Sequence, residues 1–408
     1  MGTEKSSLNS MTRLLAWMLV LCAVNNIFMY TPFFPQMLYY AVMIMLNGLL
    51  LFTNMSKPTS VGVGMWLFWI IMWVSILLNY NTLPAVFRAE QRTVAFFGAI
   101  MALGPWFLCR QLVELRLYIW ESLNKCLFFM IMLSFLGKLG GFLPSDNNGY
   151  YLGCFAHSMI LAPLSALVCL NCLHKSVSGK ELKEQRFWGG CSVAAFAVTL
   201  FASSRTSLIS VVFAAFIYFT FQISRKSGAM VKNILLFAVI LSIISSAVGG
   251  LLTGIKDKQA NSQELRQVMS SREDLWNARF QEIKESPLFG VGSHSVKIEY
   301  TDKDGKVEPG NAWLFAWSSM GIFSLLVLLG MVANSFFNLR SDIQENRREI
   351  SALLLAQVSF FALYMNGEAH ITAAGDFTYL YFWLLIGIAL GIRQYLPKEH
   401  KEMSSADA

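Results

Sequence analysis

Apolar residues along this chain come in long blocks separated by polar segments. Each block holds about 16–25 residues, roughly the length that crosses a hydrocarbon core at 1.5 Å per residue. The blocks predict about twelve transmembrane helices, at residues 14–30, 36–53, 61–80, 93–109, 124–142, 154–173, 188–203, 207–223, 233–253, 312–336, 350–366 and 377–395. We therefore expect an all-α, polytopic membrane protein in which residues 1–408 form a single membrane domain.

One polar segment is much longer than the others. Residues 254–310 lie between the ninth and tenth predicted spans and carry charges of both signs. Within this segment Ser271 can cap a helix that Pro287 ends, with Leu275 and Phe280 on a broad apolar face. We expect this amphipathic helix to lie on the outer surface of the bilayer, as a lid over the spans.

Lysine and arginine are distributed unevenly over the short loops. With a cytoplasmic N-terminus, the inside loops hold most of them, including a cluster at residues 175–186, whereas the outside loops hold few. The positive-inside rule then predicts that both termini are cytoplasmic, that residues 254–310 are periplasmic, and that the protein is in the bacterial inner membrane. The first span lacks a cleavage signal and is expected to be retained.

Composition excludes several classes of protein. Apolar residues make up 55% of the chain against 14% charged residues, which is far from a soluble balance, so the net charge of +7 reflects topology and no nucleic-acid partner is expected. The seven cysteines are odd in number and lie in or beside apolar blocks. They predict neither a disulfide framework nor a metal site. No cofactor is indicated.

Two arginines are candidates for binding an anion. Arg205 lies at the outer junction of two predicted spans, where it is either a snorkelling helix anchor or a clamp for phosphate. Arg272 lies in the first turn of the predicted surface helix, where a cation opposes the helix dipole unless Glu273 and Asp274 pair with it. Arg279 is a further candidate nearby.

Four motifs follow one another along the middle of the chain. They are Ser-Ser-Arg-Thr-Ser at residues 203–207, Arg272-x-x-Leu-Trp, Ser-Pro-Leu-Phe-Gly-Val-Gly from Ser286, and Asn311-x-x-Leu followed by Met-Gly-Ile at residues 320–322. In this order and with this topology, the chain resembles the O-antigen ligase and O-antigen polymerase superfamily over residues 150–330.

The resemblance implies a metal-independent, inverting transfer of glycan from an undecaprenyl-diphosphate donor. Arg205 and Arg272 match the family arginines that hold the diphosphate, where they would stabilise the charge that develops on the leaving group. Asn311 matches the asparagine of the last motif. The implied partners are the lipid-linked glycan donor, a glycan or lipid A core acceptor, the lipid bilayer and a chain-length regulator.

The chain departs from the family at one position. Family ligases carry a histidine immediately before the motif asparagine, and the resemblance implies that it deprotonates or orients the acceptor hydroxyl. This chain has Gly310 at that position. A glycine cannot accept a proton, so the role must pass elsewhere or be unnecessary. Glu308, two residues earlier, is the favoured candidate, because a carboxylate near apolar surroundings can have its pKa raised toward neutrality. His294 and His370 in outside segments are the alternatives, although loop histidines are more often merely solvated.

Several functions stay open at this point. Loss of the motif histidine favours a polymerase of O-antigen, capsule or exopolysaccharide repeat units over a ligase that attaches glycan to the lipid A core. A polysaccharide or glycolipid transporter has similar hydropathy, but the spans hold few deep charges and show no paired broken helices. A non-catalytic assembly subunit that has lost its base is the third alternative.

Overall fold

The computed structural model describes residues 8–29, 35–57, 59–83, 88–145, 150–223, 264–297, 310–345 and 347–396. Within these residues the chain is almost entirely helical. The helices are α1 (Ser10–Ile27), α2 (Gln36–Asn54), α3 (Val63–Leu78), α4 (Ala89–Ala99), α5 (Arg110–Gly140), α6 (Ser158–Ser178), α7 (Leu182–Phe201), α8 (Arg205–Ile223), α10 (Glu264–Glu285), α11 (Ala312–Met320), α12 (Ile322–Gln344), α13 (Ile350–Tyr364), the 3-10 turn η3 (His370–Thr372) and α14 (Phe377–Tyr395).

Seven of these helices are long and apolar enough to cross a membrane, counted over the described residues: α1, α2, α5, α6, α8, α12 and α14. The helices α3 and α13 are apolar but shorter. The prediction of an all-α, polytopic membrane protein is therefore confirmed, whereas the count of twelve spans is not reached. The predicted span at residues 233–253 lies outside the described residues.

The predicted span at residues 93–109 is wrong. Helix α4 ends at Ala99, and the chain continues through turns to strand β2 (Phe107–Leu108), which pairs antiparallel with strand β1 (Ser60–Val61). Gly104 and Pro105 explain the break, because glycine loses more entropy in a helix than any other residue and proline cannot donate the helical hydrogen bond.

Arg116, on the next helix α5, holds the non-helical segment that follows α4 in place. The sequence places it in an inside loop, but α5 begins at Arg110, well before the predicted span at residues 124–142, and Arg116 is fully buried. Its guanidinium donates to the carbonyl oxygens of four residues, at 2.7–3.3 Å: Ala102, Gly104, Phe107 and Gly387. Three of these carbonyls, those of Ala102, Gly104 and Phe107, lie in the non-helical segment between α4 and α5, so Arg116 satisfies backbone acceptors there, as a bilayer environment requires. The fourth, that of Gly387, connects Arg116 to α14.

The predicted span at residues 312–336 is also divided. The short helix α11 ends at Met320, Gly321 adopts a φ of 83°, and α12 starts at Ile322. A Cβ at Gly321 would lie 1.9 Å from the carbonyl oxygen of Leu288. The turn that follows α10 thus occupies the space beside Gly321, and this close approach of two backbones explains the break.

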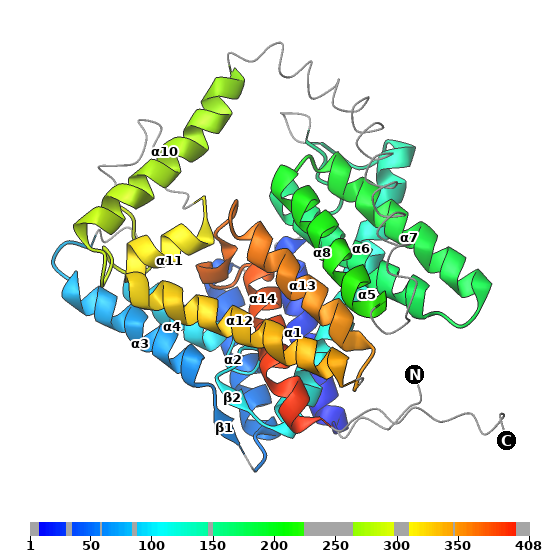
Figure 1. Ribbon diagram of the computed structural model, residues 1–408, viewed down its shortest axis with the longest axis horizontal. Helices are drawn as coiled ribbons and strands as arrows, with labels where there is room; N and C mark the ends of the chain where they lie inside the picture. Colours follow the sequence, from blue (N-terminus) through cyan, green and yellow to red (C-terminus); the bar gives the residue numbers. More distant parts are fainter. Residues whose placement is uncertain are drawn as a thin grey trace.

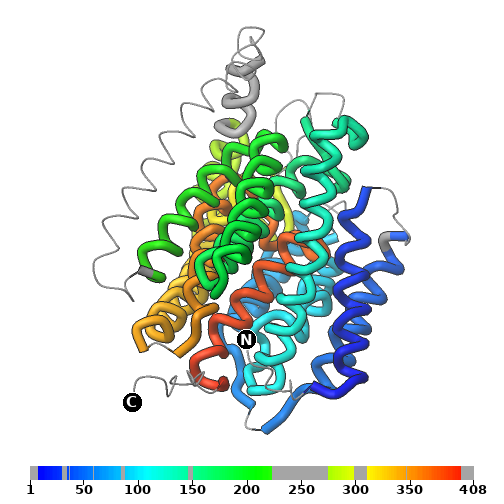
Figure 2. Tube along the Cα trace, turned by 90° about the vertical axis from the view of Figure 1, so that its right-hand side faces the viewer, coloured from blue at the N-terminus to red at the C-terminus, as the bar shows by residue number. Residues whose placement is uncertain are grey.

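The helices pack around α14, most of whose side chains are buried. Helix α8 packs along α13, α6 along α7, and α12 against α13 and α14 (Figure 1). The first turn of α8, the connection from α13 to α14 and helix α11 lie toward the upper end of this view. The turn from α12 to α13 and the last turns of α14 lie at the lower end, as Figure 2 also shows. We call these the upper and lower ends of the bundle.

Candidate functional site

Arg205 is the first residue of α8 and its side chain is exposed at the upper end of the bundle. The turn that presents it is tight: Ser203 has a φ of 57°, and the Ser204 hydroxyl donates to the Ser207 hydroxyl at 3.0 Å. The Ser204 oxygen also accepts a hydrogen bond from the Ser207 amide at 3.4 Å, so the serines of this motif start the helix. Arg205 is thereby left as an accessible cation.

Helix α10 differs from the predicted surface helix at its start. It already begins at Glu264, so Ser271 lies inside the helix and does not cap it. Arg272 consequently lies in the third turn, and the expected conflict with the helix dipole does not arise. The side chain of Arg272 lies outside the described residues. The predicted end of the helix before Pro287 is confirmed by its last residue, Glu285.

Arg279 is buried in the packed half of α10, with 1% of its side chain exposed. Its Nη2 lies 3.0 Å from Oε1 of Glu282, and the same oxygen accepts a hydrogen bond from the Lys297 amide at 2.7 Å. Burial raises the pKa of Glu282, while the charge of Arg279 opposes the shift. The bond from the Lys297 amide ties α10 to the segment that follows it, and Arg279 neutralises the buried Glu282 that accepts this bond, which favours a structural role for Arg279 over contact with substrate.

Asn311 caps α11 and joins two segments of the upper end. Its Oδ1 accepts a hydrogen bond from the Leu314 amide at 3.0 Å, and its Nδ2 donates to the carbonyl oxygen of Asn366 at 3.0 Å. Gly310, beside it, has a φ of 66° and faces Leu275 of α10. Both polar groups of Asn311 are therefore used in holding the start of α11 against the connection from α13 to α14.

His294 is buried beside α4, with 6% of its surface exposed, and its ring lies 6.4 Å from that of Phe96. Burial lowers the pKa of His294 to about 3, with a smaller contribution from the charge of Arg92. The imidazole is therefore neutral at physiological pH and shielded from solvent.

His370 is in a different environment, in the short turn η3 at the upper end. It is one quarter exposed and lies between two carboxylates: its Nδ1 is 3.4 Å from Asp376 Oδ2, and its Nε2 is 3.8 Å from Glu368 Oε2. Burial raises the pKa of Asp376, but the hydrogen bond and charge of His370, together with hydrogen bonds from Tyr379 and Thr378, outweigh it and lower the pKa of Asp376 overall. The Asp376 carboxylate is thus available to orient the imidazole.

Asp376 is a site residue that the sequence prediction omits. Its Oδ2 also accepts hydrogen bonds from the amides of Thr378 and Tyr379, at 2.9 and 3.3 Å, so Asp376 caps α14. An aspartate directly before an apolar helix is a recognisable capping signal, and it fixes the carboxylate next to the preceding turn, where His370 lies.

The structure brings some of the predicted site residues together. The bond from Asn311 to Asn366 places the start of α11 beside the segment that carries Glu368, His370 and Asp376. Arg205 is the first residue of α8, which packs along α13, and α13 leads directly into this segment. Glu308 lies outside the described residues. Over the part of the chain that the structure describes, no group of three or more His, Cys, Asp or Glu side chains is arranged to hold a metal ion.

The arrangement defines a multi-pass membrane protein with an exposed arginine and a histidine between carboxylates at one end of its bundle. A protein-family model described as O-antigen ligase (Wzy_C) matches residues 190–329. The chain thus carries an O-antigen ligase family domain, which confirms the resemblance drawn from the motifs and implies glycan transfer of the ligase or polymerase type. A search of curated proteins gives no match.

Proposed function

We propose that this protein transfers glycan from an undecaprenyl-diphosphate donor at the periplasmic face of the bacterial inner membrane. Its favoured reaction joins repeat units of O-antigen, capsule or exopolysaccharide; attachment of glycan to lipid A core is the alternative. The observation that carries the proposal is the family match over residues 190–329, because the matched segment contains both Arg205 and Arg272 in a multi-pass membrane protein.

Arg205 and Arg272 are assigned to the donor diphosphate. A guanidinium is charged at any relevant pH and offers a planar fork of donors to phosphate oxygens. When the bond between the sugar and the diphosphate breaks, negative charge grows on the leaving group, and fixed cations stabilise it. The exposed position of Arg205 at the first turn of α8 suits a diphosphate that lies at the depth of the lipid headgroups. The reaction would then require no metal ion.

His370 is assigned as the base that deprotonates the acceptor hydroxyl, a role that Gly310 cannot fill. The imidazole takes the proton of the acceptor hydroxyl, the oxygen attacks the anomeric carbon from the face opposite the diphosphate, and undecaprenyl diphosphate leaves. Partial exposure and the carboxylate of Asp376 support this choice over His294, which is shielded and a weak base. Asp376 acts as a positioning residue. Glu308 stays an alternative base.

The arginine assignment is tested with purified protein and lipid-linked glycan, without an energy source and with EDTA present. Arg205→Ala and Arg272→Ala are each expected to lower the transfer rate by about 100-fold, because each removes one fixed charge from the leaving group. Arg92→Ala, which removes an exposed arginine of α4, is the matched control and should leave the rate within about threefold. Donor binding without product in the unaltered protein would instead support a carrier.

The choice of base is tested by comparing four variants in the same assay. His370→Gln should abolish most of the transfer, whereas His294→Asn and Glu308→Gln should retain it. Asp376→Asn keeps a residue that can cap α14 but removes its charge from the imidazole, so it should change the pH dependence of the rate. Loss of transfer only in Glu308→Gln would move the role to Glu308.

A deletion strain distinguishes the two reactions of the family. Without a polymerase, single repeat units are still attached to the lipid A core, whereas without a ligase even single units are absent. We expect single units to remain. A strain that lacks them would show that the protein is the ligase.

A further inference from the structure

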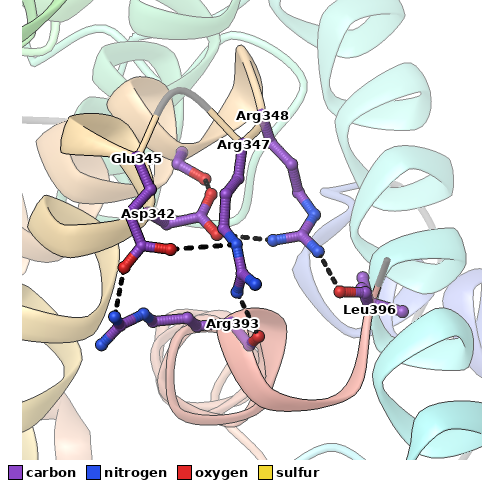
Figure 3. A network of polar contacts seen from close by, with 7 residues as sticks. Asp342, Glu345, Arg347, Arg348, Arg393 and Leu396 are labelled. Carbon is purple, nitrogen blue, oxygen red and sulfur yellow. Dashed lines mark hydrogen bonds and ion pairs between the residues drawn. The ribbon is translucent and has the colours of Figure 1, made fainter. Parts of the chain in front are cut away.

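A network of ion pairs joins three segments at the lower end of the bundle (Figure 3). Its inner part is buried: Arg348 Nη1 lies 2.6 Å from Asp342 Oδ1, and the Ser351 hydroxyl donates to Asp342 Oδ2 at 2.6 Å. Arg348 also donates to the carbonyl oxygen of Leu396. The charge of Asp342 is balanced by Arg348, so this part adds no net charge to the surface.

The outer part of the network has more positive than negative charge. Arg347 Nε lies 3.2 Å from Glu345 Oε2, and Arg393 pairs with the other oxygen of the same carboxylate. Arg347 Nη1 also donates to the carbonyl oxygen of Arg393 at 2.7 Å. Two guanidinium groups therefore share one carboxylate, and Figure 3 shows them on the same side of the turn from α12 to α13. One positive charge is left over.

These two arginines line a hollow of about 310 Å³ together with Asn338, Leu390 and Gln394. The volume is about ten times the share of one water molecule in the liquid, about 30 Å³, so a phosphate group with its ester substituents fits. The lining supplies two cationic forks, two amides and one apolar side chain. The hollow lies at the ends of α12 and α14, both of which are long and apolar enough to span the membrane.

We propose that this hollow binds the headgroup phosphate of an anionic phospholipid. Guanidinium groups form paired hydrogen bonds to phosphate oxygens, and basic pockets between spanning helices are suited to anionic headgroups. A soluble phosphate compound presents the same oxygens. The lipid is the better match, because the hollow lies where two spanning helices end and Leu390 provides an apolar wall for the glycerol end of an acyl chain. The site is at the opposite end of the bundle from Arg205 and does not depend on the proposed glycan transfer.

The test measures binding of short-chain phosphatidylglycerol to the full-length protein in detergent by native mass spectrometry, with phosphatidylcholine as the neutral lipid. The double variant Arg347→Gln, Arg393→Gln should bind phosphatidylglycerol about 25-fold more weakly, at roughly fivefold for each arginine. Arg340→Gln is the matched control, since Arg340 is an exposed arginine of α12 outside the lining of the hollow. Equal affinities in the double variant and this control would overturn the proposal.

A second variant covers the case in which the double variant does not fold. Leu390→Trp leaves both arginines and Glu345 in place but fills the hollow, so it should also weaken phosphatidylglycerol binding. Binding at the affinity of the unaltered protein would overturn the proposal whatever the double variant does. Inorganic phosphate is the competitor: displacement of the lipid at equal concentration of phosphate groups would assign the hollow to soluble phosphate and overturn the lipid assignment.

Discussion

His294 has a backbone φ of 57° and a ring that packs near Phe96, with Arg92 as the charged neighbour that acts on it. Histidine tolerates the left-handed region better than most residues with a Cβ, which accounts for the backbone but not for the burial. Burial has a consequence for stability. The unfolded chain binds a proton near the ordinary pKa of 6.5, whereas the folded chain does so only near pH 3.

Acidification below pH 6.5 should therefore destabilise the protein through His294, since the unfolded state gains a proton that the folded state refuses until about pH 3. The expected slope is about 1.4 kcal/mol per pH unit. His294→Asn removes this group while keeping a residue that tolerates positive φ. Thermal unfolding in detergent between pH 7 and pH 5 should show a flatter decline for this variant.

The control for this experiment is His157→Asn. His157 is an exposed histidine that caps α6 through Nδ1, and asparagine can replace it as a cap. Its unfolding is measured over the same pH range, and the change assigned to His294 is the flattening beyond that seen in His157→Asn. An unchanged slope in His294→Asn would mean that this histidine is accessible to protons in the folded state, and it would return as a candidate base.

Among the helices, those bounded by strong local signals are predicted best. Residues 36–53 and 377–395 agree closely with α2, which follows Pro35, and with α14, which Asp376 caps. The breaks at Gly104 and Gly321 are missed, because the residues on both sides are as apolar as in an unbroken span. Hydropathy measures how apolar the residues of a segment are, whereas a break in a helix depends on which groups pack beside it.

The same limit applies to the candidate site. Exposure of Arg205 follows from its place between two spans, so the sequence is sufficient for it. The bond from Asn311 to Asn366 and the neighbours of His370 are long-range or side-chain facts that no local pattern contains. Because Arg279 and Glu282 are three residues apart on α10, their pairing could be predicted, but their burial could not.

Gly321 provides the test at the level of helices. Gly321→Ala places a methyl group 1.9 Å from the Leu288 carbonyl oxygen at a φ of 83°, so either the turn after α10 or the break must move. We expect a loss of more than about 2 kcal/mol in stability, seen as a lower melting temperature. Gly330→Ala, on an exposed face of α12 with no atom within 4 Å, should be neutral or stabilise by about 1 kcal/mol. An equal change of melting temperature in the two variants would argue that α11 and α12 form one continuous helix.

Across the whole molecule, the two ends of the bundle have different chemistry. The upper end presents Arg205 and the carboxylates around His370, and the lower end presents the arginine network of Figure 3. The positive-inside rule assigns the lower end to the cytoplasm, although Arg116, which hydropathy assigns to an inside loop, is buried and drops out of the count. The proposed reaction requires this orientation, because its donor and acceptor meet in the periplasm.

Labelling of single added cysteines with a membrane-impermeant maleimide tests the orientation. Five of the seven native cysteines are buried and the other two are only partly exposed, so the unaltered chain is the control for a low background. Asn81 is exposed in the turn after α3, and Lys180 is exposed in the connection between α6 and α7. Asn81→Cys should be labelled from the periplasmic side, and Lys180→Cys only after the inner membrane is permeabilised. The opposite pattern would place Arg205 in the cytoplasm, where a periplasmic glycan transfer cannot use it, and would turn the arginine network toward the outer leaflet.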